Sequence, residues 1–215
     1  MTRTLSDHER GRLDTLISET EKSTDTQIVL AVIKRSDEYT ELPWKAFALG
    51  ASIAGLLLFI LDLSFYGWYP KVTVLIAVAG TLACGALFAL LTVVIPGFAK
   101  RFLSTHRAEV EVRQYAESLF LNRELFATSR RTGILLLVSL FERRIVILPD
   151  RGVDERFKES DIQSVIAAMT LFLKRKEISR AFEAGLERIS RILKTAGPGT
   201  DESELPDEII EEKGV

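Results

Sequence analysis

Two long apolar runs decide the organisation of this chain. The first reads WKAFALGASIAGLLLFIL over residues 44–61, and the second reads VTVLIAVAGTLACGALFALLTVVI over residues 72–95. A transmembrane helix needs roughly 20 mostly apolar residues to cross about 30 Å of hydrocarbon. The second run meets this requirement without a charged residue, and the first meets it when Trp44 and Lys45 lie in the membrane interface. The two runs therefore predict a helical hairpin that crosses a bilayer twice.

The short connection between the runs supports this interpretation. It is rich in the aromatic residues that favour a membrane–water interface, namely Phe65, Tyr66, Trp68 and Tyr69. The alternative is a hairpin buried in a soluble core. A buried pair of this length would need a much larger soluble domain around it, so we favour the membrane.

Basic residues near the two runs predict the orientation. The runs are flanked on their outer sides by Lys34, Arg35 and Lys45, and by Lys100, Arg101 and Arg107, whereas the connection carries only Lys71. By the positive-inside rule both termini are cytoplasmic, which predicts a multi-pass protein of the bacterial inner membrane. We also expect Lys100, Arg101 and Arg107 to contact anionic lipid at the membrane surface, since Phe98 and Phe102 lie among them.

Composition narrows the remaining classes. Charged residues make up 27% of the chain and lie mostly outside 44–95, so the protein combines a soluble domain with the hairpin. A net charge of −2 gives no nucleic-acid footprint. Cys84 is the single cysteine, which excludes a disulfide framework and a cysteine metal site. Residues 1–43 are too polar to be read as a signal peptide.

The polar segments contain helix and strand patterns in alternation. Ser6-x-x-Glu9 is a capping box that opens a first helix, and Ser160-x-x-Gln163 predicts another. The expected elements are the first helix, a strand at 27–33, the hairpin, a helix at 108–127, strands at 134–140 and 144–148 paired as an antiparallel hairpin, the helix that opens near 160, and a helix at 178–193.

These elements predict an α/β fold, a small three-layer sandwich interrupted by a two-helix transmembrane hairpin. The expected divisions are 1–43 for the first part of the domain, 44–96 for the hairpin, 97–195 for the rest of the domain, and 196–215 for a disordered acidic tail. The hairpin is thus an insertion into the domain and not an anchor at one end.

The element order and several motifs resemble the TPM domain family. The resemblance rests on Leu5-Ser-Asp-His-Glu9, Thr24-Asp-Thr-Gln-Ile28, Arg131-Thr-Gly-Ile-Leu-Leu-Leu-Val-Ser-Leu140, Glu142-Arg-Arg-Ile-Val146, Asp150-Arg-Gly-Val153 and Ala181-Phe-Glu-Ala-Gly-Leu186. The chain is most similar to the bacterial membrane-protein branch, in which a helical hairpin interrupts the domain. The resemblance implies a small α/β sandwich. Some family members bind a divalent cation or hydrolyse phosphate esters.

Asp150 is the leading candidate for a metal ligand. It follows the apolar strand at 144–148, and open α/β sheets bind ligands at the carboxyl ends of their strands. Asp154 lies within reach, and Ca²⁺ or Mg²⁺ takes several oxygens from carboxylates and loop carbonyls. Asp25 is not expected to join them, because it lies at a strand start and Asp150 at a strand end. The competing interpretation is a turn in which Asp150 binds its own backbone beside Gly152.

Other polar groups give weaker signals. Arg130, Arg131 and Thr132 form either an anion site or a solvated loop in which Gly133 supplies backbone freedom. Arg143, Arg144 and the run 174–176 are interpreted as solvated turns. His8 and His106 lie in different segments, and the sequence contains no catalytic triad, histidine metal pair or glycine-rich phosphate loop.

The function that follows is a non-catalytic one. We expect a membrane-tethered TPM-like module at the cytoplasmic face that binds a protein partner, requires no cofactor, and takes Ca²⁺ or Mg²⁺ if any cation. The alternative is a metal-assisted phosphatase with Asp150 holding the cation. A channel or transporter is disfavoured because no charge lies in the middle of either run.

Overall fold

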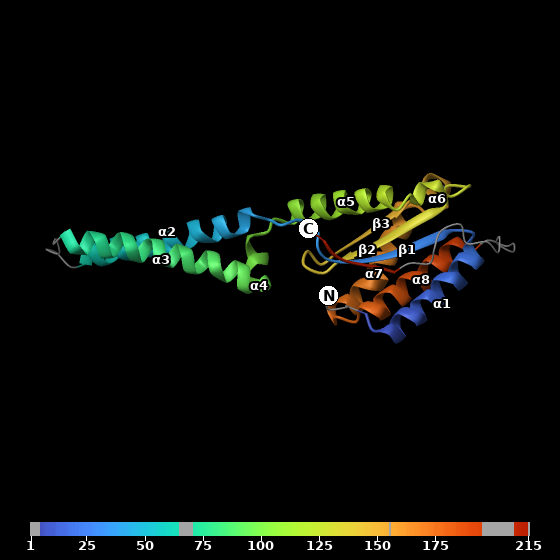
Figure 1. Ribbon diagram of the computed structural model, residues 1–215, viewed down its shortest axis with the longest axis horizontal. Helices are drawn as coiled ribbons and strands as arrows, with labels where there is room; N and C mark the ends of the chain where they lie inside the picture. Colours follow the sequence, from blue (N-terminus) through green and yellow to red (C-terminus); the bar gives the residue numbers. More distant parts are fainter. Residues whose placement is uncertain (1–4, 65–70, 155, 195–208, 215) are drawn as a thin grey trace. The chain divides into compact units, whose positions relative to one another are not determined.

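The computed structural model describes residues 5–64, 71–154, 156–194 and 209–214, except for the side chains of 71–73 and 154 (Figure 1). The chain divides into two compact units. The first unit comprises residues 1–36 and 109–215, and the second comprises residues 37–108. Each unit is described separately below.

The first unit is built on a mixed four-stranded sheet. Its strands follow the order β3-β2-β1-β4, and their bounds are β1 Gln27–Arg35, β2 Gly133–Ser139, β3 Arg144–Pro149 and β4 Ile209–Gly214. β1 is parallel to both of its neighbours, and β2 and β3 are antiparallel. β2 is buried along its whole length, which accounts for its continuous apolar sequence, since a strand covered on both faces cannot alternate apolar and polar residues.

Helices cover both faces of this sheet (Figure 1). One face packs against α1 (Asp7–Thr24), α7 (Glu159–Lys174) and α8 (Ile178–Leu193), and Leu30 of β1 shares their core with Phe182. The other face packs against α5 (Thr105–Asn122), where Ala31 of β1 shares a core with Val112. The α/β class predicted from the sequence is therefore confirmed, with helices on each side of the sheet.

One of the two predicted capping boxes is present. At the start of α1, the hydroxyl of Ser6 accepts a hydrogen bond from the backbone of Glu9, and the carboxylate of Glu9 accepts one from the backbone of Ser6 at 2.8 Å. The Ser6 hydroxyl and backbone N–H lower the pKa of Glu9. The prediction of a second capping box at Ser160-x-x-Gln163 is wrong. Because α7 begins at Glu159, its third residue is Asp161, which accepts from the backbone of Lys158 at 3.0 Å.

β4 corrects the prediction that 196–215 is a disordered tail. Residues 209–214 form an edge strand, whereas 195–208 and 215 lie outside the described residues. Ile209 and Ile210 are buried in the two opposite cores. Glu211 accepts a hydrogen bond from Arg10 of α1, and Glu212 accepts one from the hydroxyl of Tyr115 of α5, both at 2.6 Å. The acidic residues of this segment predict a solvated tail, because their partners Arg10 and Tyr115 are distant in sequence.

The hydrogen bond between Tyr115 and Glu212 gives a test of how β4 is held. Burial and this bond raise the pKa of Tyr115 above its ordinary value of 10.0. Because the folded pKa is the higher one, the stabilisation is complete below pH 10 and declines as the phenol ionises above it. Tyr115→Phe should cost about 1 kcal/mol of unfolding free energy and should speed amide exchange in β4. Lys213→Gln, at an exposed site on the same strand, is the control. Unchanged exchange in Tyr115→Phe would contradict this role.

The second unit contains two long apolar helices, α2 (Glu41–Ser64) and α3 (Lys71–Val94), followed by α4 (Pro96–Ala99) and the 3₁₀ helix η1 (Lys100–Phe102). α2 and α3 lie side by side (Figure 1). Two glycines permit this contact: a Cβ on Gly50 would come within 2.8 Å of the Phe88 ring, and one on Gly85 within 2.8 Å of the Phe47 ring.

Both helices are long and apolar enough to cross a membrane. The qualifying segments are Glu41–Ser64 and Val74–Val94, and only 11% and 6% of their most apolar windows are buried within the chain. Helices of a soluble core would be covered, so this exposure disfavours the buried-hairpin alternative. The aromatic residues Phe65–Tyr69, expected at the interface, lie outside the described residues.

Candidate functional site

The sheet topology brings Asp25 and Asp150 to the same end of the first unit. β1 pairs with β2 in parallel, so that Gln27 lies opposite Gly133. β3 returns antiparallel to β2 and places Pro149 opposite Ile134. The end of β3 therefore lies at the edge where β1 and β2 begin. The expectation that strand direction separates Asp25 from Asp150 is wrong, because it holds only for parallel strands. The loop 128–132 contacts both residues, through Arg130 at Asp25 and Arg131 at Asp150. We call the region formed by Asp25, Asp150 and this loop the polar end.

Asp150 is held by its own backbone and by an arginine. Its side chain is only 6% exposed. One carboxylate oxygen accepts a hydrogen bond from the backbone of Arg151 at 2.8 Å, and the other accepts one from Nε of Arg131 at 3.3 Å. The backbone N–H of Asp150 donates to the carbonyl of Gly133 at 2.8 Å. The contact with the backbone of the adjacent Arg151 is a local bond of the kind that the turn interpretation of Asp150 predicts. The contact with Arg131 adds an ion pair that was not foreseen.

A second acid–base pair lies beside the first. Asp25 ends α1 and forms an ion pair with Arg130. Asp25 and Arg131 both have left-handed backbones, with φ of 56° and 54°. Such values are uncommon outside glycine and are maintained only where the surrounding contacts fix them. Here the backbone of Asp25 donates to Glu21, and that of Arg131 donates to Thr128.

Two glycines allow the backbones at the polar end to approach closely. A Cβ on Gly152 would lie 2.2 Å from the carbonyl oxygen of Arg130 and 2.7 Å from that of Arg131. A Cβ on Gly133 would lie 2.5 Å from the carbonyl oxygen of Leu125. The sequence predicts a turn beside Gly152 and backbone freedom at Gly133. The contacts show instead that both positions exclude a side chain.

This arrangement does not fit a divalent cation as it stands. Among the described residues there is no group of three histidine, cysteine or acidic side chains that could hold a metal ion. Both oxygens of Asp150 already accept hydrogen bonds. Asp154 ends the short helix α6 (Arg151–Asp154), and its side chain lies outside the described part of the structure. A cation at Asp150 would have to compete with the positive charge of Arg131 for this carboxylate.

The arginines of the loop 128–132 already bind carboxylates. Arg130 and Arg131 keep 63% and 50% of their side chains exposed while pairing with Asp25 and Asp150. The loop is thus ion-paired, which is neither of the two alternatives that the sequence left open. Thr132 is buried, and its backbone donates to the hydroxyl of Thr128 at 3.0 Å.

The buried acceptor at Asp150 predicts a structural effect of mutation. Asp150→Ala should lower the unfolding free energy by about 1–3 kcal/mol, because Arg131 and the backbone of Arg151 lose their acceptor. Chemical denaturation of the full chain in detergent measures this difference. Glu19→Ala is the control, because Glu19 is an exposed acidic residue on α1. Equal stability of wild type and Asp150→Ala would contradict the structural role.

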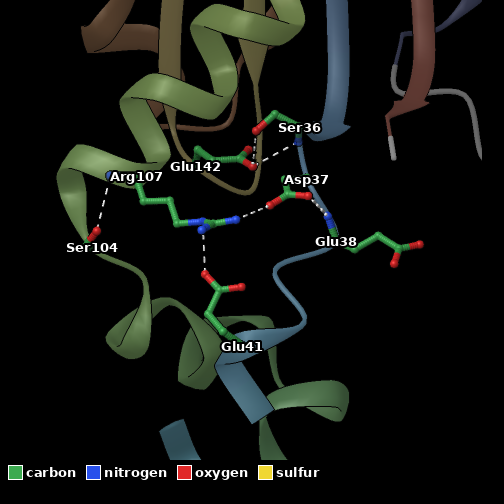
Figure 2. A network of polar contacts seen from close by, with 7 residues as sticks. All are labelled: Ser36, Asp37, Glu38, Glu41, Ser104, Arg107 and Glu142. Carbon is green, nitrogen blue, oxygen red and sulfur yellow. Dashed lines mark hydrogen bonds and ion pairs between the residues drawn. The ribbon is translucent and has the colours of Figure 1, made fainter. Parts of the chain in front are cut away.

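A buried carboxylate, that of Glu142, marks the opposite end of the sheet, and no local sequence pattern predicts it. Glu142 is 7% exposed and lies in the turn between β2 and β3. Its carboxylate accepts hydrogen bonds from the backbone of Ser36 at 2.9 Å and from the Ser36 hydroxyl at 2.7 Å (Figure 2). It also accepts one from the hydroxyl of Ser139. These hydrogen bonds fix the residue that follows β1 against the turn.

The second unit contains a charge network centred on Arg107. Its guanidinium contacts Asp37 at 3.0 Å and Glu41 at 3.1 Å (Figure 2). Lys100 and Arg101 lie in η1, where Arg101 is exposed. The membrane-surface role expected for these three residues stays a prediction. Asp37 and Glu41 neutralise the charge of Arg107 locally. The positive charge of Arg101 is therefore more available to lipid than that of Arg107.

The remaining candidates are dispersed. His8 lies on α1 and His106 on α5, and both are exposed. Lys174, Arg175 and Lys176 lie at the turn between α7 and α8 and are exposed.

Comparison with known proteins shows similarity to one family. The family model described as the TPM domain matches residues 99–192, which include α5, β2, β3, α7 and α8. The structure is similar to the NMR structure of the BA42 protein from the psychrophilic bacterium Bizionia argentinensis, with a TM-score of 0.59, 15% identity, and coverage of 99% of this chain and 98% of that chain. At this identity the similarity concerns the fold alone. No curated protein matches the chain. The four motifs quoted from residues 131–186 lie within the matched segment, so the match confirms the resemblance to the TPM domain family over residues 99–192.

Proposed function

We propose that this protein is a membrane-anchored TPM-domain module that binds a protein partner at the cytoplasmic face of the bacterial inner membrane. The observation that carries the proposal is the exposure of α2 and α3. Large apolar side chains such as Leu56, Leu75 and Val93 are 60%, 71% and 71% exposed. A soluble protein rarely exposes a continuous apolar surface of this size. Each helix has 24 residues and spans about 36 Å, which suffices for the roughly 30 Å of hydrocarbon.

The orientation follows from the positive-inside rule. The basic residues Lys34, Arg35 and Lys45 precede or begin α2, and Lys100 and Arg101 follow α3. The excess of positive charge on this side supports a cytoplasmic location for both segments of the TPM domain.

Labelling of single cysteines tests the orientation. In a Cys84→Ser background, Gly67→Cys in the connection between the helices should react with a membrane-impermeant maleimide added outside intact spheroplasts. Lys194→Cys should react only after the membrane is permeabilised, because it belongs to the cytoplasmic domain. Labelling of Lys194→Cys in intact spheroplasts would overturn the orientation, and loss of the protein to the soluble fraction would overturn the membrane anchor.

The ion pairing of the carboxylates at the polar end favours binding over catalysis. Its two carboxylates and two arginines engage each other, Asp25 with Arg130 and Asp150 with Arg131. A general base or a metal ligand would need a carboxylate that is available to a substrate or a cation. The exposed faces of Arg130 and Arg131 suit a docking surface for an acidic partner better than a reaction centre.

The alternative function is a metal-assisted phosphatase. One observation favours it: Asp25, Asp150 and two arginines lie at one end of the sheet, as a site for a cation and a phosphate group would require. In that case a bound cation would take Asp150 from Arg131, and the released guanidinium would be able to hold the phosphate oxygens.

Hydrolysis of p-nitrophenyl phosphate by the purified full chain distinguishes the two functions. As a binding module the protein should show no hydrolysis that depends on Mg²⁺, Ca²⁺ or Mn²⁺, while affinity capture from detergent extracts yields a reproducible partner. Cation-dependent turnover that is lost in Asp150→Asn and retained in the control Asp161→Asn would establish the phosphatase instead. Failure to capture any reproducible partner would contradict the binding function.

A further inference from the structure

Two basic turns gather at the end of the first unit that lies opposite the polar end. The turn between β2 and β3 contains Arg143, followed by Arg144 at the start of β3. This turn adjoins the end of β1, since Phe141 donates its backbone N–H to the carbonyl of Lys34 at 2.9 Å. The second turn joins α7 to α8 and contains residues 174–176.

The second turn reaches this end because α7 runs back along the sheet. α7 follows β3 and α6, which lie at the polar end, and its 16 residues cover about 24 Å. This length is comparable with the sheet, since the nine residues of β1 span about 30 Å. Figure 1 shows the turn between α7 and α8 and the turn between β2 and β3 at the same end of the unit.

The basic side chains of the two turns are available to a ligand. Arg143, Lys174, Arg175 and Lys176 are exposed, and Arg144 is half-buried. Within the described residues, none of the five forms a side-chain hydrogen bond or an ion pair.

The acidic side chains nearby are mostly engaged. Glu142 is buried with Ser36 and Ser139, Glu177 pairs with Arg180 at 3.1 Å, and Glu211 pairs with Arg10. Asp7 and Glu9 lie at the start of α1, where the helix dipole favours negative charge. The two turns therefore present a surface of positive charge, which we name the basic end.

An apolar side chain accompanies this charge. Leu171, in the last turn of α7, is 55% exposed and precedes Lys174 by three residues, which places both on one side of the helix. Exposed basic residues combined with an exposed leucine are typical of surfaces that bind the headgroup region of a bilayer.

We propose that the basic end binds anionic phospholipid, so that the TPM domain docks on the membrane surface through Arg143, Lys174 and Lys176. The inference rests on the proposed membrane anchor. β1 ends at this end of the sheet, and the connection from β1 to α2 has only five residues, 36–40, which span at most about 17 Å. When α2 crosses the bilayer, this short connection keeps the basic end near the lipid headgroups. Each basic residue near anionic lipid raises the ratio of membrane-bound to unbound domain by roughly fivefold.

Fluorescence quenching in nanodiscs tests the docking. The full chain with Cys84→Ser and Arg175→Cys carries a fluorophore at position 175, and the lipid carries a nitroxide on its headgroup. Quenching should be strong in nanodiscs that contain phosphatidylglycerol, weak in phosphatidylcholine alone, and reduced by high salt. The triple variant Arg143→Glu, Lys174→Glu, Lys176→Glu should fall to the phosphatidylcholine value, and the corresponding glutamine variant should give an intermediate value.

A matched control reverses three charges near the polar end: Arg156→Glu, Arg191→Glu and Lys194→Glu. It should quench as the parent does. Equal quenching in both lipids, or equal loss in the control and the test variant, would overturn the docking while leaving the anchor intact. Failure of the chain to enter nanodiscs at all would instead overturn the anchor.

Discussion

The pairing of β1 on both of its edges is the constraint on which the first unit depends. β1 lies between β2 and β4, and both neighbours come from chain that follows the two apolar helices. Both faces are buried too, with Leu30 in one core and Ala31 in the other. A strand so enclosed must be apolar at nearly every position, which explains the run Gln27–Ile33. It also explains why the hairpin is tolerated as an insertion, since the sheet needs only that β1 reaches its partners.

Several features were predictable from the sequence because the signal was local. The apolar runs of β1 and β2, the antiparallel return into β3, and the Ser6–Glu9 capping box depend on residues close together in the chain. Features set by distant partners were not predictable. β4 carries acidic residues that resemble a solvated tail until Arg10 and Tyr115 are placed beside them. Likewise, the proximity of Asp25 and Asp150 follows from the direction of β3 relative to β1, which no local pattern records.

The candidate site illustrates how charge pairing changes the meaning of a motif. Asp150 and Arg131 each suggested a ligand when considered alone, a cation for one and an anion for the other. In the fold they satisfy each other, and the same holds for Asp25 and Arg130. An exposed ion pair contributes little to stability, but the pair at Asp150 is nearly buried on the acidic side, where loss of a partner is costly. The polar end thus combines a structural role with two arginines that remain accessible from outside.

The position of β1 has a consequence for biosynthesis. The strand is translated before the apolar helices, whereas β2 begins about a hundred residues later at Gly133. Throughout that interval the nascent chain carries an apolar segment with two open hydrogen-bonding edges, the kind of segment that aggregates when left uncovered. When the helices insert into the membrane as proposed, the insertion holds this segment apart from other nascent chains while the remaining strands are made. Fragments that stop before β2 are therefore expected to be poorly soluble even when the apolar helices are removed.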